Sequence, residues 1–515
     1  MATTLAAVDI GASSGRVIVG SFEGGRLTMT ETGRFANGPV SVQERCGARL
    51  HWDVLRLWAG VLKGLRTAVR DAGSLDGVGI DTWGVDYGLF DVDGVLTGNP
   101  ASYRCTRTEG AIERVFEYFS GEAMYKVNGA QVQQFNTMFQ LVSEEPVHLQ
   151  TASRLLLMPD LFGYWLSGRM VAEMTNASTT GLVDVERREW AKGLCADLEC
   201  AFGIPVRRLL PDIVAPGTVI GPVRQEVIEL TTPAGSPTPL IAVGSHDTAS
   251  AVVAIPAEGS NFAYISCGTW SLVGLELPKP VLSEASRAAN FTNELGVDRT
   301  VRFLKNVMGL WILNECVRAW KDRGIETSVA QLVTEAADVP MLRTVVDVND
   351  SAFLHPGDMA SRITELARES GQPLPLTPVE YARCILDSLA LAYRRAVREG
   401  TQLADRPVEV VHIVGGGVRA KLLCQLTADA TGLRVIAGPE EGTALGSLLV
   451  QARTVGAIHG GLPALRRVVR ASYPTVRYEP DAAHRTAWDA AEKRILGGPT
   501  TTTISDQPAD RKRKT

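Results

Sequence analysis

One strand–turn–strand unit occurs in each half of the chain, and this repetition constrains the fold more than any other feature. The first unit covers residues 5–22, with a turn from Gly11 to Arg16. The second covers residues 262–276, with the turn Gly268 to Ser271. Apolar segments joined by short turns rich in Gly, Ser and Thr pair as antiparallel strands. Two such units predict duplicated α/β domains that face a common cleft.

A segment rich in proline separates the two units. Residues 231–239 contain three prolines and a glycine, which cannot continue a helix or a central strand. We therefore place the domain boundary near residue 240, with domains at 1–240 and 241–490, and expect a strand at 240–244 to open the second domain. The Thr-rich end, residues 497–515, is predicted to be a disordered tail.

Helix signals surround these units. Asp53 is expected to cap a helix that ends at Gly73. Thr377, Pro378 and Glu380 form a capping box for a long helix that we expect Gly400 to end. Further elements are predicted as strands at 76–83, 408–414 and 433–437 and as helices from about 421 and 442.

Composition excludes several classes of protein. The formal charge is −5, which favours neither nucleic acid nor a membrane surface as a partner. The apolar run 259–275 is too short and too polar for a spanning helix, and Asp9 interrupts the apolar start that a cleaved signal needs. We expect a cytoplasmic monomer or homodimer. The eight scattered cysteines are interpreted as reduced thiols, with disulfides or a metal site as alternatives.

Three turns have the composition of nucleotide-binding loops. Backbone N–H groups of a glycine-containing turn can bind phosphate oxygens, and Asp9 before the first turn could hold Mg²⁺ through waters. After the apolar strand 408–414, residues without a Cβ would let a planar ring lie against the backbone. Taken singly, each is equally an ordinary turn. The candidate residues are Ala12, Ser13, Ser14, Gly15, Arg16, Thr269, Gly415, Gly416 and Gly417.

The segment Ser245 to Thr248 (Ser-His-Asp-Thr) follows a predicted strand, where α/β sheets bind ligands. A Ser-His-Asp triad is rejected because adjacent residues point apart and no nucleophile elbow surrounds Ser245. Asp247 as a single general base fits phosphoryl transfer, since a carboxylate needs only to orient a hydroxyl and accept its proton late. A helix-capping Asp is the alternative. Residues 81–86 and 103–108 have polyol-site composition, although surface loops use the same residues.

Together these motifs resemble the FGGY carbohydrate kinase family, which belongs to the superfamily of actin, hexokinase and the heat-shock chaperone ATPases. The resemblance covers about residues 5–480 and is closest to the branch that acts on L-rhamnulose. Its motifs occur in the same order as in the family. They are residues 9–16, 79–86, 157–160, 245–250, 268–271, 304–306, 308–311 and 412–417.

The resemblance implies two actin/hexokinase-like (ribonuclease H-like) domains around a central cleft, the first binding sugar and the second ATP. Asp247 would take the proton from the C1 hydroxyl of L-rhamnulose, and Asp9 would reach Mg²⁺ through water. The implied sugar contacts are Gly84, His246, Asp247, Thr248 and Asn306. The implied ATP contacts are Ala12 to Arg16, Thr269, Asn314 and Gly415 to Gly417.

Two alternatives stay open on the sequence. The substrate could be another ketose, such as L-fuculose or L-ribulose. Ketoses that differ in the configuration of one hydroxyl are distinguished by side chains whose positions cannot be found from sequence spacing. The chain could also be a catalytically silent sugar or nucleotide sensor, which loss of the base would favour. Asp247 and both phosphate-type turns are present.

Overall fold

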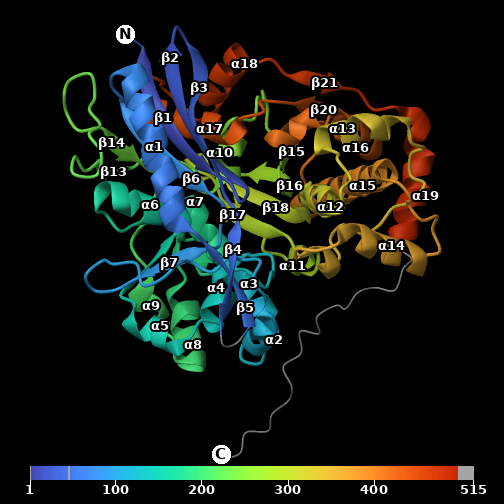
Figure 1. Cartoon of the computed structure of the whole chain (residues 1–515), viewed down its shortest axis with the longest axis horizontal. Helices are drawn as coiled ribbons and strands as arrows, with labels where there is room; N and C mark the ends of the chain where they lie inside the picture. The colour runs from blue at the N-terminus through green and yellow to red at the C-terminus, as the bar shows by residue number, and fades with distance from the viewer. Residues whose placement is uncertain (1, 45–46, 497–515) are drawn as a thin grey trace, which may run out of the picture.

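The computed structural model describes residues 2–44 and 47–496 and contains two mixed β-sheets surrounded by helices (Figure 1). The expected tail at 497–515 lies outside the described residues. The six-stranded sheet has the order β13 (Val219–Pro222), β14 (Pro239–Ile241), β6 (Gly77–Thr82), β1 (Thr3–Ile10), β2 (Ser14–Glu23), β3 (Arg26–Ala36). The seven-stranded sheet has the order β17 (Thr292–Leu295), β18 (Val301–Met308), β16 (Trp270–Leu277), β15 (Phe262–Cys267), β19 (Val410–Val414), β20 (Arg434–Ala437), β21 (Val476–Tyr478).

The two sheets share one arrangement. In the first, β1, β2 and β3 form an antiparallel meander and β6 lies parallel to β1. In the second, β15, β16 and β18 pair antiparallel in the same spatial order, β17 is added outside β18, and β19 lies parallel to β15. Each predicted strand–turn–strand unit is the hairpin at the centre of its sheet. The predicted duplication of α/β domains is therefore confirmed.

Helices cover both faces of each sheet. Helix α1 (Val54–Ala72) packs its apolar face on β2 and β3. As predicted, Asp53 caps this helix, accepting a hydrogen bond from Arg56 N, and Gly73 ends it. The remaining helices outside the insertion described below are α10 (Asp247–Val253), α11 (Glu284–Ala288), α12 (Trp311–Asp322), α13 (Val329–Glu335), α14 (Met359–Glu369), α15 (Pro378–Ala404), α16 (Lys421–Thr431), α17 (Gly442–Thr454), α18 (Leu462–Ser472) and α19 (Arg485–Leu496).

Helix α10 lies between the two sheets. Its Val253 belongs to the apolar core under the first sheet, while Ala251 and Val252 belong to the core under the second. Helix α17 packs along α10 and also on β1 and β6, so a helix from late in the chain covers the first sheet. The chain thus crosses between the sheets more than once.

The boundary expected near residue 240 does not coincide with the border between the sheets. Strand β14, expected to open the second domain, instead pairs in parallel with β6 of the first sheet. The prolines at 231–239 mark a surface loop before this strand, because proline is compatible with a loop inside a domain as well as with a linker. We propose that the border follows α10, and that the C-terminal segment α17 to α18 returns to the first domain.

The long helix α15 also differs at one end from the prediction. The capping box at Thr377 and Glu380 is present, but the helix continues past Gly400 to Ala404. Gly400 is buried, and a Cβ there would lie 3.3 Å from the ring of Phe291. The glycine therefore allows close packing inside the helix, and Asp405 in the left-handed conformation follows its end.

A helical insertion follows β6 and fills the lower left of Figure 1. Its apolar core is distinct from those of the two sheets and also contains Leu295 and Val301 of the second sheet. No sequence pattern predicted it. Its helices are α2 (Ala111–Phe116), α3 (Gly121–Asn128), α4 (Thr137–Val142), α5 (Pro146–Thr151), α7 (Met174–Ala177), α8 (Lys192–Phe202) and α9 (Val206–Leu209). Helix α6 (Met158–Ser167) lies in the same stretch of chain but packs on β6, and its Leu161 and Phe162 belong to the core of the first sheet. Two-stranded pairs complete the fold: β4 (Pro39–Glu44) with β5 (Gly47–Trp52), β7 (Tyr87–Phe90) with β8 (Arg154–Leu157), β9 (Ala172–Glu173) with β12 (Ile213–Val214) and β10 (Val183–Asp184) with β11 (Glu189–Trp190).

Two findings bear on the composition argument. Among residues 2–44 and 47–496, no helix is long and apolar enough to span a membrane. The seven cysteines in this part of the chain are free thiols, and all but Cys200 are buried.

The contact between α10 and α17 gives a first testable prediction. A Cβ at Gly446 would collide with the backbone oxygen of Ser250, so Gly446→Ala should lower the free energy of unfolding by about 1–3 kcal/mol through overpacking. Gly193 on α8 is the matched control, since a Cβ there meets nothing within 4 Å. Gly193→Ala should raise stability by roughly 0.4–1 kcal/mol. Urea unfolding followed by circular dichroism measures both, and equal stabilities of the two variants would refute this account of the helix contact.

Candidate active site

A cavity of about 320 Å³ opens where the two sheets, α10 and the helical insertion meet. The hairpin turns of both sheets reach it, and so does the start of α10. Its walls comprise Asp9, Gly11, Ala12, Ser13, Ser14, Arg16, Trp83, Gly84, Val85, Tyr103, Gln131, Phe135, Asn136, Thr179, His246, Asp247, Thr248, Ser266, Cys267, Gly268, Thr269, Trp270, Leu272, Thr292, Glu294, Asn306, Gly415, Gly416, Glu440, Glu441, Gly442 and Thr443.

Of the individual residues that the sequence assigned to the base, the sugar, ATP or Mg²⁺, all but three line this cavity. Gly15 pairs with Ile10 inside the hairpin, where a Cβ would collide with the ring of Phe35. Gly417 packs against Cys267, which a Cβ would likewise strike. Asn314 is exposed on α12, away from the cavity walls. Gly15 and Gly417 thus serve close packing, while Asn314 has no contact with the cavity.

Asp9 ends β1 and faces the cavity beside Arg16. Register in the hairpin places Asp9 opposite Arg16, and Arg16 Nη2 lies 2.7 Å from Asp9 Oδ2. Arg16 also pairs with Glu441, from the segment before α17. Burial raises the pKa of Asp9 to about 6, although Arg16 lowers it. The first turn is thus tied to the far wall of the cavity through one guanidinium group.

Asp81 lies beside Asp9 in the neighbouring parallel strand β6. Its side chain is fully buried, and burial, with the repulsion of Asp9 and Asp247, raises its pKa well above the ordinary value. A protonated Asp81 adds no charge to this wall, because the energetic cost of burying a carboxylate is avoided when it is neutral. Asp81 does not line the cavity.

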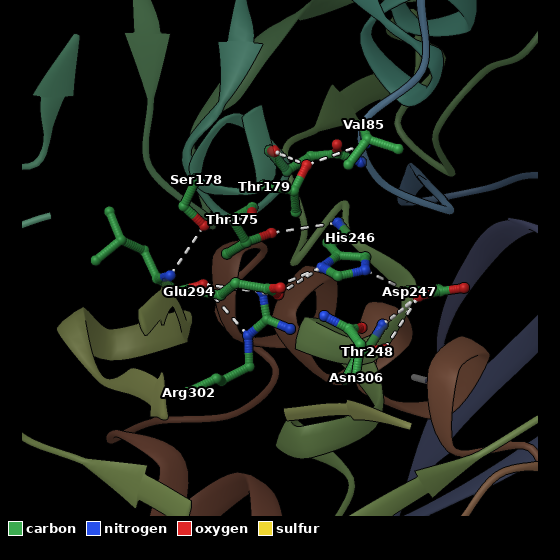
Figure 2. A network of polar contacts seen from close by, with 12 residues as sticks. Val85, Thr175, Ser178, Thr179, His246, Asp247, Thr248, Glu294, Arg302 and Asn306 are labelled. Atoms are coloured by element: carbon green, nitrogen blue, oxygen red, sulfur yellow. Dashed lines mark hydrogen bonds and ion pairs between the residues drawn. The ribbon is translucent and has the colours of Figure 1, made fainter. Parts of the chain in front are cut away.

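Asp247 is the first residue of α10, and its side chain remains 31% exposed at the cavity. Its Oδ1 accepts hydrogen bonds from Thr248 N at 2.6 Å and Thr248 Oγ1 at 3.2 Å (Figure 2). The helix N-terminus beneath the carboxylate also favours its negative charge. These contacts fix the orientation of a carboxyl group that the cavity leaves accessible.

The Nδ1 edge of the His246 ring contacts a buried ion pair formed by Glu294 and Arg302. Its Nδ1 lies 3.0 Å from Glu294 Oε2 and 3.2 Å from Arg302 Nη2, while its Nε2 lies 3.5 Å from Asp247 Oδ1. Arg302 is fully buried and lies 3.0 Å from Glu294. Burial alone would raise the pKa of Glu294, but Arg302 and His246 hold it below its ordinary value. Figure 2 shows this chain of contacts from β18 through His246 to Asp247.

The backbone before His246 is anchored by the insertion. Glu173 Oε2 accepts hydrogen bonds from Ser245 Oγ at 2.7 Å and from Ser245 N at 3.1 Å. The Ser245 hydroxyl therefore faces away from His246, consistent with rejecting a Ser-His-Asp triad. Thr82 N of β6 donates to Ser245 O at 2.9 Å, which brings the 81–86 segment against the start of α10.

Part of the cavity wall is aromatic. Val85 has a positive φ of 69°, a strained conformation for a β-branched residue. Hydrogen bonds hold it, from Val85 N to Thr179 Oγ1 at 3.0 Å and from Thr137 Oγ1 to Val85 O at 2.7 Å. Trp270 packs against Phe135 at 5.7 Å between ring centroids. Such a wall can bind the C–H face of a sugar.

The second half of the predicted polyol group has other contacts. Tyr103 lines the cavity and accepts a hydrogen bond from Trp270 Nε1 at 3.2 Å. Arg104 lies 3.8 Å from the ring centroid of Trp311, and Arg107 pairs with Glu144 at 3.1 Å, both outside the cavity walls. The arginines therefore support the loop and do not reach the cavity.

Sequence reasoning missed the cavity residues that come from the insertion and from the second sheet. Gln131, Phe135, Asn136 and Thr179 lie in an insertion with no regular pattern, and Glu294 is on a strand that was not predicted. No signal in a single sequence marks them, because only the fold brings them beside Asp247. The residues added by the structure are Gln131, Phe135, Asn136, Thr179, Ser266, Leu272, Thr292, Glu294, Glu440, Glu441, Gly442 and Thr443.

The cavity residues can hold a magnesium ion only together with waters and substrate phosphates. In the described part of the chain, no cluster of three or more His, Cys, Asp or Glu side chains is placed to hold a metal. Mg²⁺ in phosphoryl-transfer sites commonly uses one or two carboxylates together with waters and substrate phosphates. Asp9 and Asp247 face the same cavity and supply that number of carboxylates.

Comparison with known proteins now places the chain. Two curated relatives are rhamnulokinases: that of Bacteroides thetaiotaomicron is 41% identical over 94% of this chain and 97% of the relative, and that of Enterococcus faecalis is 41% identical over 92% and 94%. Among solved structures, gluconate kinase from Lactobacillus acidophilus aligns with a TM-score of 0.76 at 14% identity, covering 96% of this chain and 97% of that one. Plasmodium falciparum glycerol kinase with ADP aligns at 0.72 and 15%, covering 96% and 98%. These structures show the fold, and the expected actin/hexokinase-like pair of domains is confirmed.

The family models cover both halves. The N-terminal domain of the FGGY family of carbohydrate kinases matches residues 4–254, and the C-terminal domain matches residues 263–455. Both the matched ranges and the identity to the curated relatives extend over most of the chain. The chain therefore belongs to the FGGY family of carbohydrate kinases.

Proposed function

We propose that this chain transfers the γ-phosphoryl group of ATP to the C1 hydroxyl of L-rhamnulose, giving L-rhamnulose 1-phosphate and ADP. The position of Asp247 carries the proposal. Its accessible carboxylate lies in one cavity with both hairpin turns and with Gly84 and Asn306. Curated relatives named rhamnulokinase share 41% of their residues with it, which supports L-rhamnulose as the ketose.

Asp247 is proposed as the general base. The amide and hydroxyl of Thr248 both donate to Oδ1, so Oδ2 is left to accept a hydrogen bond from the sugar C1 hydroxyl. The carboxylate orients this oxygen towards phosphorus and takes its proton late in the transfer. His246, held by Glu294 and Arg302, fixes the neighbouring wall, and Gly84, Thr248 and Asn306 complete the proposed sugar contacts.

The hairpin turns are proposed to bind the phosphates. Ala12, Ser13, Ser14 and Thr269 line the cavity, and backbone N–H groups of such turns can bind phosphate oxygens. The adenosine would lie along Gly415 and Gly416. Gly15 and Gly417 would act only by permitting this packing, and Asn314 would need a movement of α12 to reach a nucleotide.

We propose that Asp9 and Asp247 hold Mg²⁺ through waters when MgATP binds. The ion would neutralise the charge that develops on the phosphate oxygens. Asp9 would then exchange its pairing with Arg16 for a contact with a hydrated cation.

Closure of the two domains over the substrates would exclude water and limit ATP hydrolysis. The buried free thiols are in keeping with a reducing, cytoplasmic location.

Replacement of Asp247 tests the proposed general base. Asp247→Asn keeps the shape of the side chain but cannot accept the proton, so kcat with L-rhamnulose should fall about 10²–10⁴-fold while KM for ATP changes little. The measurement is the initial rate of ADP release with MgATP. Asp197 on α8 is exposed and outside the cavity, and Asp197→Asn is the control that should retain the full rate.

The same assay is run with L-rhamnulose, L-fuculose and L-ribulose. Highest kcat/KM on L-rhamnulose supports the proposed substrate. Turnover on another ketose alone would keep the kinase and overturn the assignment to L-rhamnulose. Folded protein that binds ATP but phosphorylates none of the sugars would be a sensor.

Replacement of Gly416 tests the proposed adenosine contact. A Cβ at Gly416 meets no atom within 4 Å, so Gly416→Leu should fold normally but occupy the space beside the proposed adenosine position. KM for ATP should rise by about tenfold or more, equivalent to about 1.4 kcal/mol of binding, with KM for the ketose unchanged. Gly259→Leu is the control, because Gly259 is equally open and lies outside the cavity walls. An unchanged KM for ATP in Gly416→Leu would place the adenosine elsewhere.

A further inference from the structure

Gln131 lies between α3 and α4 of the insertion and is one of the cavity residues that no motif predicted. Its side chain is 4% exposed and lines the cavity wall next to Asn306. Asn306 stands on β18 of the second sheet. The two side chains therefore meet across the junction between the insertion and the second domain.

The orientation of the Gln131 amide is fixed by Asn306. Gln131 Oε1 accepts hydrogen bonds from Asn306 N and from Asn306 Nδ2, each at 3.0 Å. Both partners are donors, so the atom that faces them must be the amide oxygen. Gln131 Nε2, with its two N–H groups, is consequently turned away from Asn306.

Within the described residues, Gln131 Nε2 donates no hydrogen bond to the protein, and this nitrogen is not sealed off from solvent. A nearly buried amide donor without an acceptor is energetically unfavourable. Because Gln131 lines the cavity, a ligand oxygen in the cavity can approach this amide. A bound hydroxyl would therefore supply the acceptor that Gln131 Nε2 lacks.

We propose that Gln131 is a ketose-binding residue that donates a hydrogen bond from Nε2 to a hydroxyl oxygen of the sugar. The proposal rests on the proposed function and adds to it the way in which the polyol is recognised. Because Asn306 Nδ2 is used on Gln131, Asn306 has its Oδ1 left as an acceptor. The pair thus offers one donor and one acceptor side by side, which matches two adjacent hydroxyl groups of a ketose.

This arrangement draws the sugar site from both halves of the chain. Gln131 comes from the insertion after the first sheet, and Asn306 comes from the second sheet, so the sugar contacts are not confined to the N-terminal domain. A site built to hydrogen-bond a hydroxyl discriminates strongly against ligands that leave its donor unpaired. Gln131 would therefore contribute to ketose binding in the ground state and the transition state alike.

The test uses Gln131→Glu in the full-length protein. The substitution preserves size and keeps Oε1 as the acceptor for Asn306, but it replaces the donor by a second acceptor that is ionised at an assay pH of about 8. KM for L-rhamnulose should rise at least tenfold, while kcat and KM for ATP stay within about twofold, as expected when uniform binding is lost. The melting temperature should be unchanged.

Two further variants keep the outcome interpretable. Gln131→Met removes both donor and acceptor at similar size, and it should also raise KM for the ketose. Gln150 on α5 is exposed, and Gln150→Glu is the matched amide-to-acid control that should leave all constants unchanged. If both Gln131 variants fold and keep the wild-type KM for the ketose, the proposal is wrong. A fall in kcat with both KM values unchanged would also overturn it, because Gln131 would then act on alignment.

Failure of the proposed function would be visible separately in the wild-type protein. If the wild type turns over a different ketose, the same comparison is made with that ketose, and a tenfold rise in its KM supports the role of Gln131. If no ketose is turned over, calorimetric titration of L-rhamnulose into wild type and Gln131→Glu replaces the rate assay. Binding that is at least tenfold weaker in the variant supports the proposal, and equal affinity, or no binding to either protein, refutes it.

Discussion

The active-site geometry depends on the position of one short helix, α10, between the two sheets. Apolar residues on opposite sides of α10 belong to the cores of both sheets, and α17 packs along it without a side chain at Gly446. Since Asp247 is the first residue of this helix, the carboxylate is placed by the packing of both domains at once. A movement of either domain relative to α10 would change the distance from Asp247 to the turns of that domain.

Charge around the cavity is balanced through buried pairs. Arg16 lies between Asp9 and Glu441, and Arg302 lies between Glu294 and His246. Burial of Asp9 and Asp81 raises their pKa values, so the carboxylate pair on adjacent strands carries less than two negative charges near neutral pH. Asp247, partly exposed and at a helix N-terminus, remains the carboxylate best placed to act on a bound hydroxyl.

Much of the fold follows from patterns in the sequence. The central hairpins, α1 with its Asp53 cap and the capping box of α15 were predicted because local signals decide them. Gly400 was misinterpreted because packing against Phe291 and a helix stop both call for glycine. The pairing of β14 with β6 and the helical insertion could not be predicted, since both are decided by contacts distant in sequence. The site divides in the same way: Asp247 and the turns lie in motifs, whereas Gln131 and Glu294 reach the cavity only through the fold.

In the proposed mechanism, Asp247 directs one hydroxyl of the ketose, that on C1, to the γ-phosphorus of ATP. The most direct test of this step is carbon NMR of the product formed from MgATP and L-rhamnulose labelled with carbon-13 at C1. Phosphorylation at C1 should split the C1 resonance by coupling to phosphorus, with one ADP formed for each sugar phosphate. Phosphorus coupling at another carbon, or ADP formed without any sugar phosphate, would contradict it.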